Sequence, residues 1–164
     1  ELARSLLGLL ADQDPVGGAV LFRDPAQPAT ARPGATPAAL QAFARESLRH
    51  ALAQPWAIER ALGEWLTEPK PHVWFEPPRD ASTIAGRGLR LDRRTRMGHD
   101  ARCIYVNGES YSVRGRDAVL LHRLADARFL ASRDAARLSA QARCGVDEWL
   151  AAGWLHSEGD DDGS

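Results

Sequence analysis

The sequence predicts a mainly helical α+β fold, and three observations lead to this prediction. Apolar residues recur at helical spacing over residues 37–53 and 56–67. One strong hairpin signal, Asn107-Gly108, lies between alternating apolar residues in the second half of the chain. The 164 residues are 44% hydrophobic and 26% charged, which is ordinary for globular proteins and fits one medium domain or two small ones.

Composition excludes several classes of protein. Lys plus Arg is 21 and Asp plus Glu is 22, so no strong net charge selects nucleic acid or anionic lipid as a partner. No apolar run approaches the roughly 18 residues of a membrane span, and residues 1–14 do not resemble a signal peptide. The two cysteines form no CxxC pair, which excludes a zinc ribbon or disulfide scaffold. We therefore expect a reduced, cytoplasmic setting without a membrane partner.

The first half of the chain predicts three helices. A leucine-rich helix spans residues 1–11, a second spans 37–53 with Thr36 as its cap and Pro37 in its first turn, and a third spans 56–67. The second and third have wide apolar faces, which either pack within the monomer or contact a partner subunit. The residues predicted for a dimer interface are Leu40, Phe43, Leu48, Ile58, Leu62, Trp65 and Leu66.

A proline-rich segment separates the two halves. Residues 68–78, EPKPHVWFEPP, contain four prolines, which remove backbone donors and fix φ, so this segment cannot be helical. Val73-Trp74-Phe75 is predicted to form an extended apolar clip among the prolines. We predict the boundary between the two halves here, with residues 79–88 as a linker or short helix.

The second half predicts strands followed by helices. Residues 97–113 contain the hairpin and read as β structure. Asp117 is expected to cap one helix and Ser132 to open another, and a last helix stops at Gly153. A short apolar stub and a disordered acidic tail are expected to follow. This order of elements suits a winged-helix domain over residues 79–155.

No motif predicts catalysis by this chain. A non-haem iron site needs two histidines and one carboxylate, and only His156-Ser157-Glu158 has a matching HxE spacing. No later histidine completes that set, so we interpret it as part of a surface tail. The chain has no GxSxG motif, and Gly86-Arg87-Gly88 lacks the third glycine of a dinucleotide loop. We therefore predict no catalytic residue and no metal ligand.

One basic stretch is a candidate for contact with nucleic acid. Between Gly86 and Arg116 there are eight arginines and three acidic residues, which suits contact with backbone phosphates. The alternative interpretation, without a binding function, is that arginine occupies ordinary solvent-facing strand positions. Because Asp147 and Glu148 would face the phosphates from the last helix, we expect weak or no binding, indifferent to sequence. The predicted phosphate contacts are Arg93, Arg94, Arg96 and Arg102.

Several motifs occur in a characteristic order along the chain: FRDP at 22–25 with Gln27-Pro28, LGEWLTEPKP at 62–71 with VWF at 73–75, IYVNGE at 104–109 and AGWL at 152–155. Together they resemble the C-terminal region of the bacterial ribosomal oxygenases. These are JmjC, cupin-type dioxygenases that hydroxylate arginine. The resemblance covers the chain from about Leu2 to Leu155.

The resemblance implies a division of the chain. Residues 1–22 would be the post-barrel helix at the end of an upstream barrel domain, 23–78 a helical dimerisation region with the proline-rich clip, 79–155 the winged helix and 156–164 the acidic tail. The iron-binding barrel, with its HxD motif and distal histidine, would precede Glu1. No catalytic residue of the family therefore carries over to this sequence.

For the full-length family, the resemblance implies Fe(II) and 2-oxoglutarate as cofactors, a ribosomal protein as substrate and a homodimer. We expect this chain to supply assembly and substrate presentation, with no cofactor and no activity of its own. The alternative is a free-standing winged-helix protein that binds nucleic acid through its arginine-rich strands.

Overall fold

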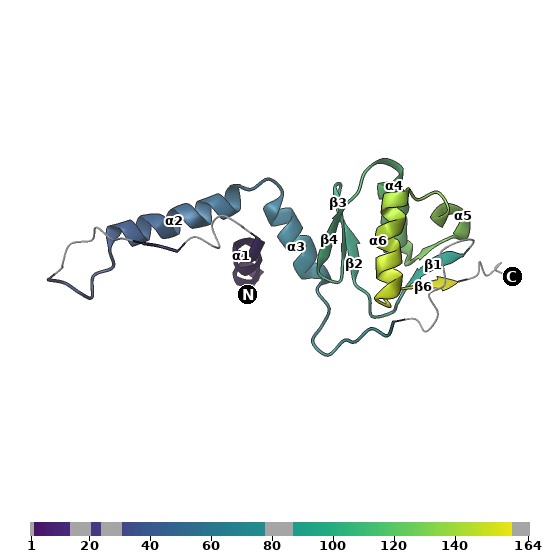
Figure 1. Ribbon diagram of the computed structural model, residues 1–164, viewed down its shortest axis with the longest axis horizontal. Helices are drawn as coiled ribbons and strands as arrows, with labels where there is room; N and C mark the ends of the chain where they lie inside the picture. Colours follow the sequence, from purple (N-terminus) through teal and green to yellow (C-terminus); the bar gives the residue numbers. More distant parts are fainter. Residues whose placement is uncertain (1, 14–20, 24–30, 78–86, 159–164) are drawn as a thin grey trace. The chain divides into compact units, whose positions relative to one another are not determined.

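The computed structural model describes residues 2–13, 21–23, 31–77 and 87–158. The chain divides into two compact units, Glu1–Leu62 and Gly63–Ser164. The described residues form helices and two small antiparallel sheets, which confirms the predicted mainly helical α+β fold (Figure 1). Among the helices of these residues, none has the length and apolar character that crossing a membrane requires.

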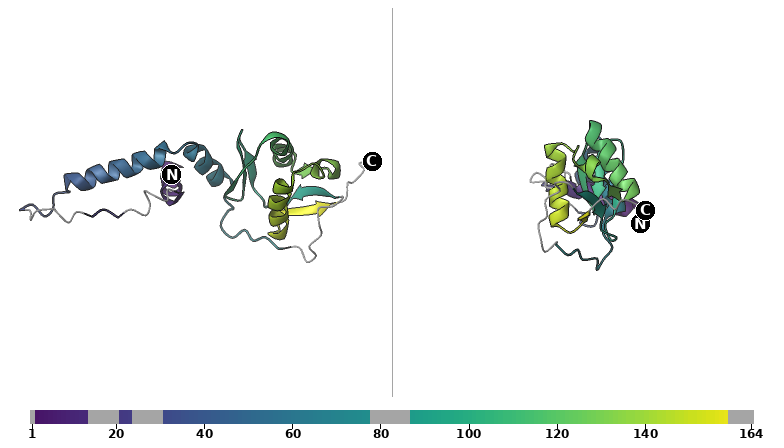
Figure 2. Two further views of the ribbon diagram at one scale, coloured as in Figure 1. Left: turned by 45° about the horizontal axis from the view of Figure 1, so that its top comes forward. Right: turned by 90° about the vertical axis from the view of Figure 1, so that its right-hand side faces the viewer.

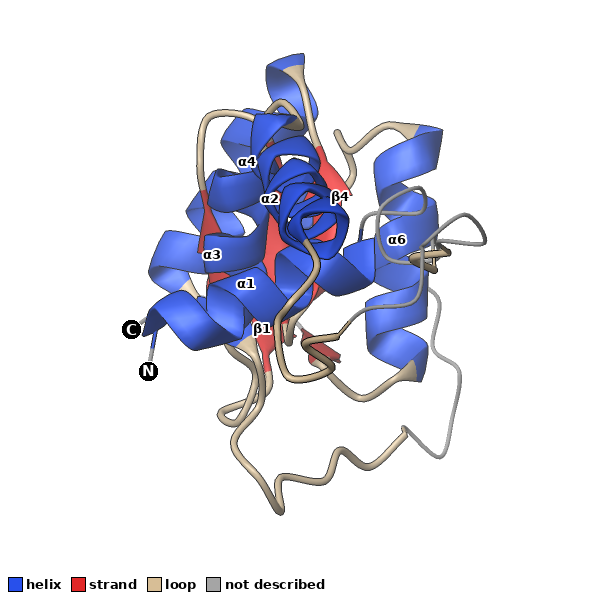
Figure 3. Ribbon diagram, turned by 90° about the vertical axis from the view of Figure 1, so that its left-hand side faces the viewer, coloured by secondary structure: helices blue, strands red, loops and turns tan. Residues whose placement is uncertain are grey.

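Three helices form the N-terminal unit: α1 (Leu2–Gln13), α2 (Ala38–Ala53) and the first part of α3 (Ala57–Thr67), all drawn in blue in Figure 3. Their buried core consists of Leu10, Ala51, Ala57 and Ala61. Three of these four residues are alanines, which let helices approach closely but remove little apolar surface from water. Most of the long apolar side chains of α2 therefore lie outside this core.

The start of α2 differs from the prediction by one position. Pro37, with φ −60° and ψ 138°, is the extended N-cap residue and not part of the first turn. The predicted cap by Thr36 is wrong, because no side chain caps this helix; the backbone carbonyl of Thr36 instead accepts a bond from Gln41 Nε2 at 3.2 Å. Trp56 adopts a left-handed φ of 63°, so α3 begins one residue later than predicted.

Three strands of the C-terminal unit form the sheet β2-β3-β4: β2 (Met97–His99), β3 (Cys103–Val106) and β4 (Glu109–Ser112). The predicted hairpin is confirmed, since Val106 pairs with Glu109 across a two-residue loop. The loop residues Asn107 and Gly108 have φ values of 48° and 89°, the left-handed conformations that a type I′ turn requires.

The last turn of α3 packs on this hairpin within the C-terminal unit. Gly63 lies so close to the Tyr105 ring that a Cβ on Gly63 would come within 2.3 Å of a ring carbon. The buried Thr67 hydroxyl donates to the Gly63 carbonyl at 2.9 Å and accepts from the Gly108 amide at 3.2 Å. The absence of a side chain at Gly63 thus permits the contact between helix and strand.

A second sheet has the order β5-β1-β6, with β1 (Gly88–Leu91), β5 (Phe129–Leu130) and β6 (Leu155–Glu158). The sequence did not predict these strands, because none exceeds four residues and their pairing joins distant segments. Leu155 pairs with Leu91 and is buried. Residues 156–158, assigned from sequence to the acidic tail, complete β6 instead, whereas 159–164 and the predicted linker at 79–86 lie outside the described residues.

The remaining helices are α4 (Gly115–Ala127), α5 (Ser132–Ala135) and α6 (Ala140–Ala151). The predicted cap by Asp117 is wrong: the N-cap residue is Arg114, three residues earlier, and α4 begins at Gly115. The Asp117 carboxylate instead accepts a bond from the Ser139 amide at 3.0 Å. Ser139 itself caps α6, its hydroxyl accepting from Ala142 N, and fixes where that helix begins.

Both sheets and all three of these helices contribute to one hydrophobic core, and Figure 2 shows them packed together. The hairpin contributes Ile104 and Val106 from one face of β3, as its alternation predicts. The largest fully buried side chains are Leu89, Ile104, Leu121, Leu124, Leu130, Leu155, Val106 and Val146.

The proline-rich clip, defined here as residues 68–77, packs against the C-terminal unit. Phe75 meets Trp154 edge-on, with ring centroids 6.3 Å apart. At Gly153, whose φ is 74°, a Cβ would come within 2.3 Å of the Glu76 carbonyl oxygen. The division between compact units thus falls within α3 and not at the clip, while the assignment of residues to functional domains stays a prediction.

Gly63→Ala is expected to destabilise the C-terminal unit, because the added Cβ would collide with the Tyr105 ring. We expect a loss of about 1–3 kcal/mol in the free energy of unfolding, measured by urea denaturation. The control is Gly145→Ala in α6, where a Cβ meets nothing within 4 Å and helix propensity favours alanine by up to about 1 kcal/mol. Equal stability of the two variants would contradict this packing.

Candidate functional site

Four of the seven residues predicted for the dimer interface are exposed. Their exposed fractions lie between 36% and 51%, large values for apolar side chains, and they are Leu40, Leu48, Ile58 and Leu66. The other three are half-buried: Phe43, Leu62 and Trp65. Phe43 packs on Phe22, with ring centroids 5.5 Å apart. The role of these residues in an interface stays a prediction.

The sequence did not single out two further exposed apolar residues for the interface, Leu52 and Trp56. Leu48 and Leu52 lie one turn apart on α2 and line a shallow groove with Arg45 and Arg49, the α2 groove. The spacing of the two leucines was a signal available in the sequence. Trp56 lies in the turn between α2 and α3 and is 52% exposed, which its predicted place inside a helix did not indicate.

Among the arginines predicted to contact phosphate, Arg94 is bonded within the chain. Its Nε and Nη2 donate to the two carboxylate oxygens of Asp92 at 2.9 and 3.1 Å. Its Nη1 donates to the Trp74 carbonyl at 2.7 Å, and the guanidinium lies 5.7 Å from the centre of the Phe75 ring. Arg94 therefore fastens the clip to the residues that follow β1.

A second predicted phosphate contact, Arg96, also holds the clip, because its Nη1 donates to the Glu68 carbonyl at 2.9 Å. Arg93 and Arg102 are exposed, and the backbone amide of Arg102 donates to Asp100. The structure thus gives two of the four arginines a role in tertiary structure. Phosphate contact by any of them stays a prediction.

Asp92 is the centre of a polar cluster. Besides Arg94, its carboxylate contacts His156 Nε2 at 3.0 Å, and its backbone carbonyl accepts from Arg128 Nη2 at 2.7 Å. The bonds from Arg94 hold the pKa of Asp92 well below its ordinary value, against the opposing effect of burial, and His156 adds to the lowering. His156, interpreted from sequence as part of a surface tail, lies in β6 and is held by this carboxylate.

Two histidines stack on each other between β2 and α4. The rings of His99 and His122 have centroids 4.0 Å apart, and His99 Nε2 contacts Asp126 at 3.1 Å. Burial, and then the neighbouring His99, lower the pKa of His122. Within the described residues, no group of three or more His, Cys, Asp or Glu side chains is placed to hold a metal ion. These residues therefore do not fit an iron centre.

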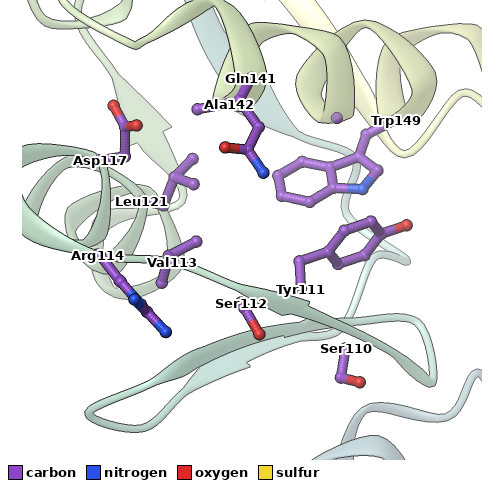
Figure 4. A pocket seen from close by; sticks show the side chains of 11 residues that line it. Ser110, Tyr111, Ser112, Val113, Arg114, Asp117, Leu121, Gln141, Ala142 and Trp149 are labelled. Carbon is purple, nitrogen blue, oxygen red and sulfur yellow. The ribbon is translucent and has the colours of Figure 1, made fainter.

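The C-terminal unit contains a groove between β4 and the helices α4 and α6, the β4 groove (Figure 4). Its volume is about 610 Å³, and its lining includes Tyr111, Val113, Leu121, Gln141 and Trp149. β4 and α4 follow each other in the chain, whereas α6 begins well after them in the sequence. Sequence reasoning missed the groove because α6 closes it from a distance, although it placed Tyr111 and Val113 on the same face of the hairpin.

Tyr111 and Trp149 form an aromatic pair in the β4 groove. Their rings meet edge-to-face, with centroids 5.0 Å apart and planes at 78° (Figure 4). The Tyr111 hydroxyl donates to the Glu109 carboxylate. Burial and this bond raise the pKa of Tyr111 to about 12, so the phenol stays protonated and neutral at physiological pH. The pair suits binding and supplies no acid or base for catalysis near pH 7.

Comparison with known proteins gives one family and several structures of one fold. The family model described as "ROXA-like winged helix" matches residues 48–156. Two solved structures of Escherichia coli YcfD match with TM-scores of 0.67 and 0.68, at 21% and 22% sequence identity. The first covers 94% of this chain and the second 95%. No curated protein matches the sequence.

The matched structures are longer than this chain, which spans 44% and 46% of them. The second is described as a ribosomal oxygenase in complex with cobalt and succinic acid. A further YcfD structure, with cobalt and 2-oxoglutarate, matches with a TM-score of 0.65 at 22% identity and covers 95% of this chain. At these identities the likeness is one of fold.

Asp92→Asn is expected to destabilise the C-terminal unit, because it removes the charge that Arg94 and His156 contact. Since folding lowers the pKa of Asp92, its stabilising contribution is present above the ordinary pKa and is lost as the pH falls through the folded value. We expect a loss of about 2 kcal/mol at pH 7 by urea denaturation, and a smaller loss below about pH 4. The control is Asp147→Asn at an exposed position. Equal stability of both variants at pH 7 would contradict this assignment.

Proposed function

This chain belongs to the family of the ROXA-like winged helix, and from that premise we propose that it forms the C-terminal assembly and substrate-presenting part of a ribosomal protein hydroxylase. The matched structures with cobalt, succinic acid and 2-oxoglutarate support an enzyme that uses a divalent metal and 2-oxoglutarate. With Fe(II) as the metal, such an enzyme would oxidise its protein substrate in a domain outside the described residues, which do not fit a metal centre.

The observation that carries the assembly role is the mismatch between core and surface in the N-terminal unit. Its buried core is mostly alanine, while Leu48, Leu52 and Ile58 each expose about half of their surface. Exposed apolar side chains on neighbouring helices, here α2 and α3, favour burial against a partner. The partner that we propose is a second copy of the chain, so that the protein is a homodimer.

A ribosomal protein is the substrate that the matched ribosomal oxygenase structures support. Such a substrate would place the enzyme in the cytoplasm. In this proposal the winged helix holds part of the substrate protein, while the chemistry takes place elsewhere. The polar network around Asp92 would keep the presenting surface rigid, because it joins the clip, β1 and β6.

The alternative function, binding of nucleic acid through the arginine-rich strands, has less support. Two of its four arginines, Arg94 and Arg96, donate to the carbonyls of Trp74 and Glu68 and would have to leave these bonds to contact phosphate. Two acidic residues, Asp147 and Glu148, are exposed on α6 and would repel a phosphate backbone.

Ile58→Asp is expected to weaken self-association at least tenfold, because it places a charge on the proposed apolar interface. Sedimentation equilibrium of the 164-residue chain over a range of concentrations measures this change. The control is Val119→Asp, which places the same charge at a 60% exposed apolar residue on α4. The control should keep the mass of the unmutated chain. A monomeric unmutated chain at high concentration would refute the proposed homodimer.

The purified 164-residue chain is expected to form no succinate from 2-oxoglutarate in the presence of Fe(II) and oxygen. The physical reason is that the described residues offer no set of two histidines and a carboxylate to bind the metal. A succinate assay, with isothermal titration of Fe(II) under anaerobic conditions, checks this. Stoichiometric Fe(II) binding together with succinate formation would contradict the proposed division of labour.

A further inference from the structure

The outer edge of β4 offers backbone groups to a further strand. β4 is the last strand of the sheet β2-β3-β4, and the two-residue loop makes Val106 and Glu109 a hydrogen-bonded pair. Pairs alternate along such a ladder, so Ser110 and Ser112 direct their N–H and C=O groups away from β3. Within the described residues these groups make no backbone hydrogen bond outside the ladder.

The β4 groove lies along this edge, with a buried indole donor beside it. Trp149 is 2% exposed, and its Nε1 makes no well-aligned hydrogen bond among the described residues, although it lies close enough to the Tyr111 hydroxyl to lower the pKa of that phenol. Figure 4 shows Gln141 on one side of the indole and Tyr111 on the other. An open strand edge and a groove beside it that offers both apolar and polar side chains are elements with which proteins bind extended peptides. The volume of about 610 Å³ is ample for several side chains.

Charge decides which segment suits the groove. At the hairpin end, the Glu109 carboxylate accepts from Tyr111, and the carboxylates of both Glu109 and Glu148 raise the pKa of that phenol. Glu148 is exposed and lies on the same face of α6 as Gln141, which lines the groove seven positions earlier in the sequence; Glu148 itself lies next to the lining and is not part of it. Arg114 and Asp117 line the other end of the groove, where the Asp117 carboxylate accepts from the Ser139 amide. A basic side chain against the Tyr111 ring would thus lie near two carboxylates.

We propose that the β4 groove binds an extended, lysine- or arginine-bearing segment of a partner protein, which adds as a fourth strand to the edge of β4. Ser110 and Ser112 supply the backbone hydrogen bonds, and Tyr111, Trp149, Glu109 and Glu148 receive a basic side chain. The proposal deepens the proposed function and rests on it for the identity of the partner as the protein to be hydroxylated.

The test follows the amide signals of the 164-residue chain by ¹⁵N NMR during titration with a synthetic peptide of alternating valine and arginine. We expect the amide signals of Ser110 and Ser112 to shift. Ser112→Pro should lower the affinity about tenfold, because proline removes the outward N–H from an edge position that tolerates it. The matched control, Ser112→Ala, keeps the N–H and should bind like the unmutated chain. The thermal melts of both variants verify that they fold.

Charge is tested by a second pair of variants. Glu148→Lys should weaken binding of the basic peptide by several-fold, whereas Asp147→Lys should not, because Asp147 lies about 100° further around α6. A peptide in which glutamate replaces arginine should bind more weakly than the basic peptide. Equal binding of both peptides would overturn the proposed chemistry of the partner.

Three other outcomes would overturn the proposal: no shift at Ser110 and Ser112, equal affinity of the Ser112→Pro and Ser112→Ala variants, or a single-stranded RNA that shifts these amides while the basic peptide does not. Sedimentation of the same samples separates the two proposals. A dimer without peptide binding contradicts the groove alone, and a monomer that binds the peptide contradicts the proposed assembly alone.

Discussion

The Asp92 carboxylate is the interaction on which the arrangement of the C-terminal unit depends most. It lies directly after β1, receives Arg94 and His156, and through Arg94 reaches the clip. A buried charge is tolerated only when it is fully bonded, so these groups must be brought together when the unit folds. The backbone of Asp92 is bonded as well: its carbonyl accepts from the Arg128 side chain, which follows α4, and its amide donates to the carbonyl of Trp154, which precedes β6. Segments far apart in sequence are thereby joined by polar bonds in addition to the hydrophobic core that they share.

The N-terminal unit follows the opposite design. Its helices meet through alanines, and such a core stabilises little because each methyl group removes little area from water. Leu48 and Leu52 stay outside on α2. The C-terminal unit is thus held by its own core and polar network, whereas the N-terminal unit exposes large apolar side chains to solvent. This contrast supports assembly through the N-terminal unit and presentation through the C-terminal unit.

The arginine-rich character of the second half has a structural explanation. Arg94, Arg96 and Arg128 donate to backbone carbonyls, the acceptors that irregular segments cannot satisfy within themselves. Guanidinium groups suit this task because they carry several donors in a fixed plane and stay charged. The arginines of a basic stretch in a small domain can therefore donate hydrogen bonds to the carbonyls of the domain's own loops. The acidic residues near the β4 groove, Glu109 and Glu148, point to a different kind of partner from nucleic acid.

The sequence alone determined the local elements: the hairpin, because Asn107-Gly108 permits only a tight turn of one hand, and the helices, because their apolar spacing is unambiguous. It also carried the resemblance that indicated the family. Only the tertiary structure decided which residues distant in sequence contact one another. The sheet β5-β1-β6 and the β4 groove join residues separated by tens of positions, and Asp92 contacts not only its neighbour Arg94 but also His156, which no local pattern connects to it. Periodicity reports on neighbours in sequence, whereas pairing and polar satisfaction are settled when distant segments meet.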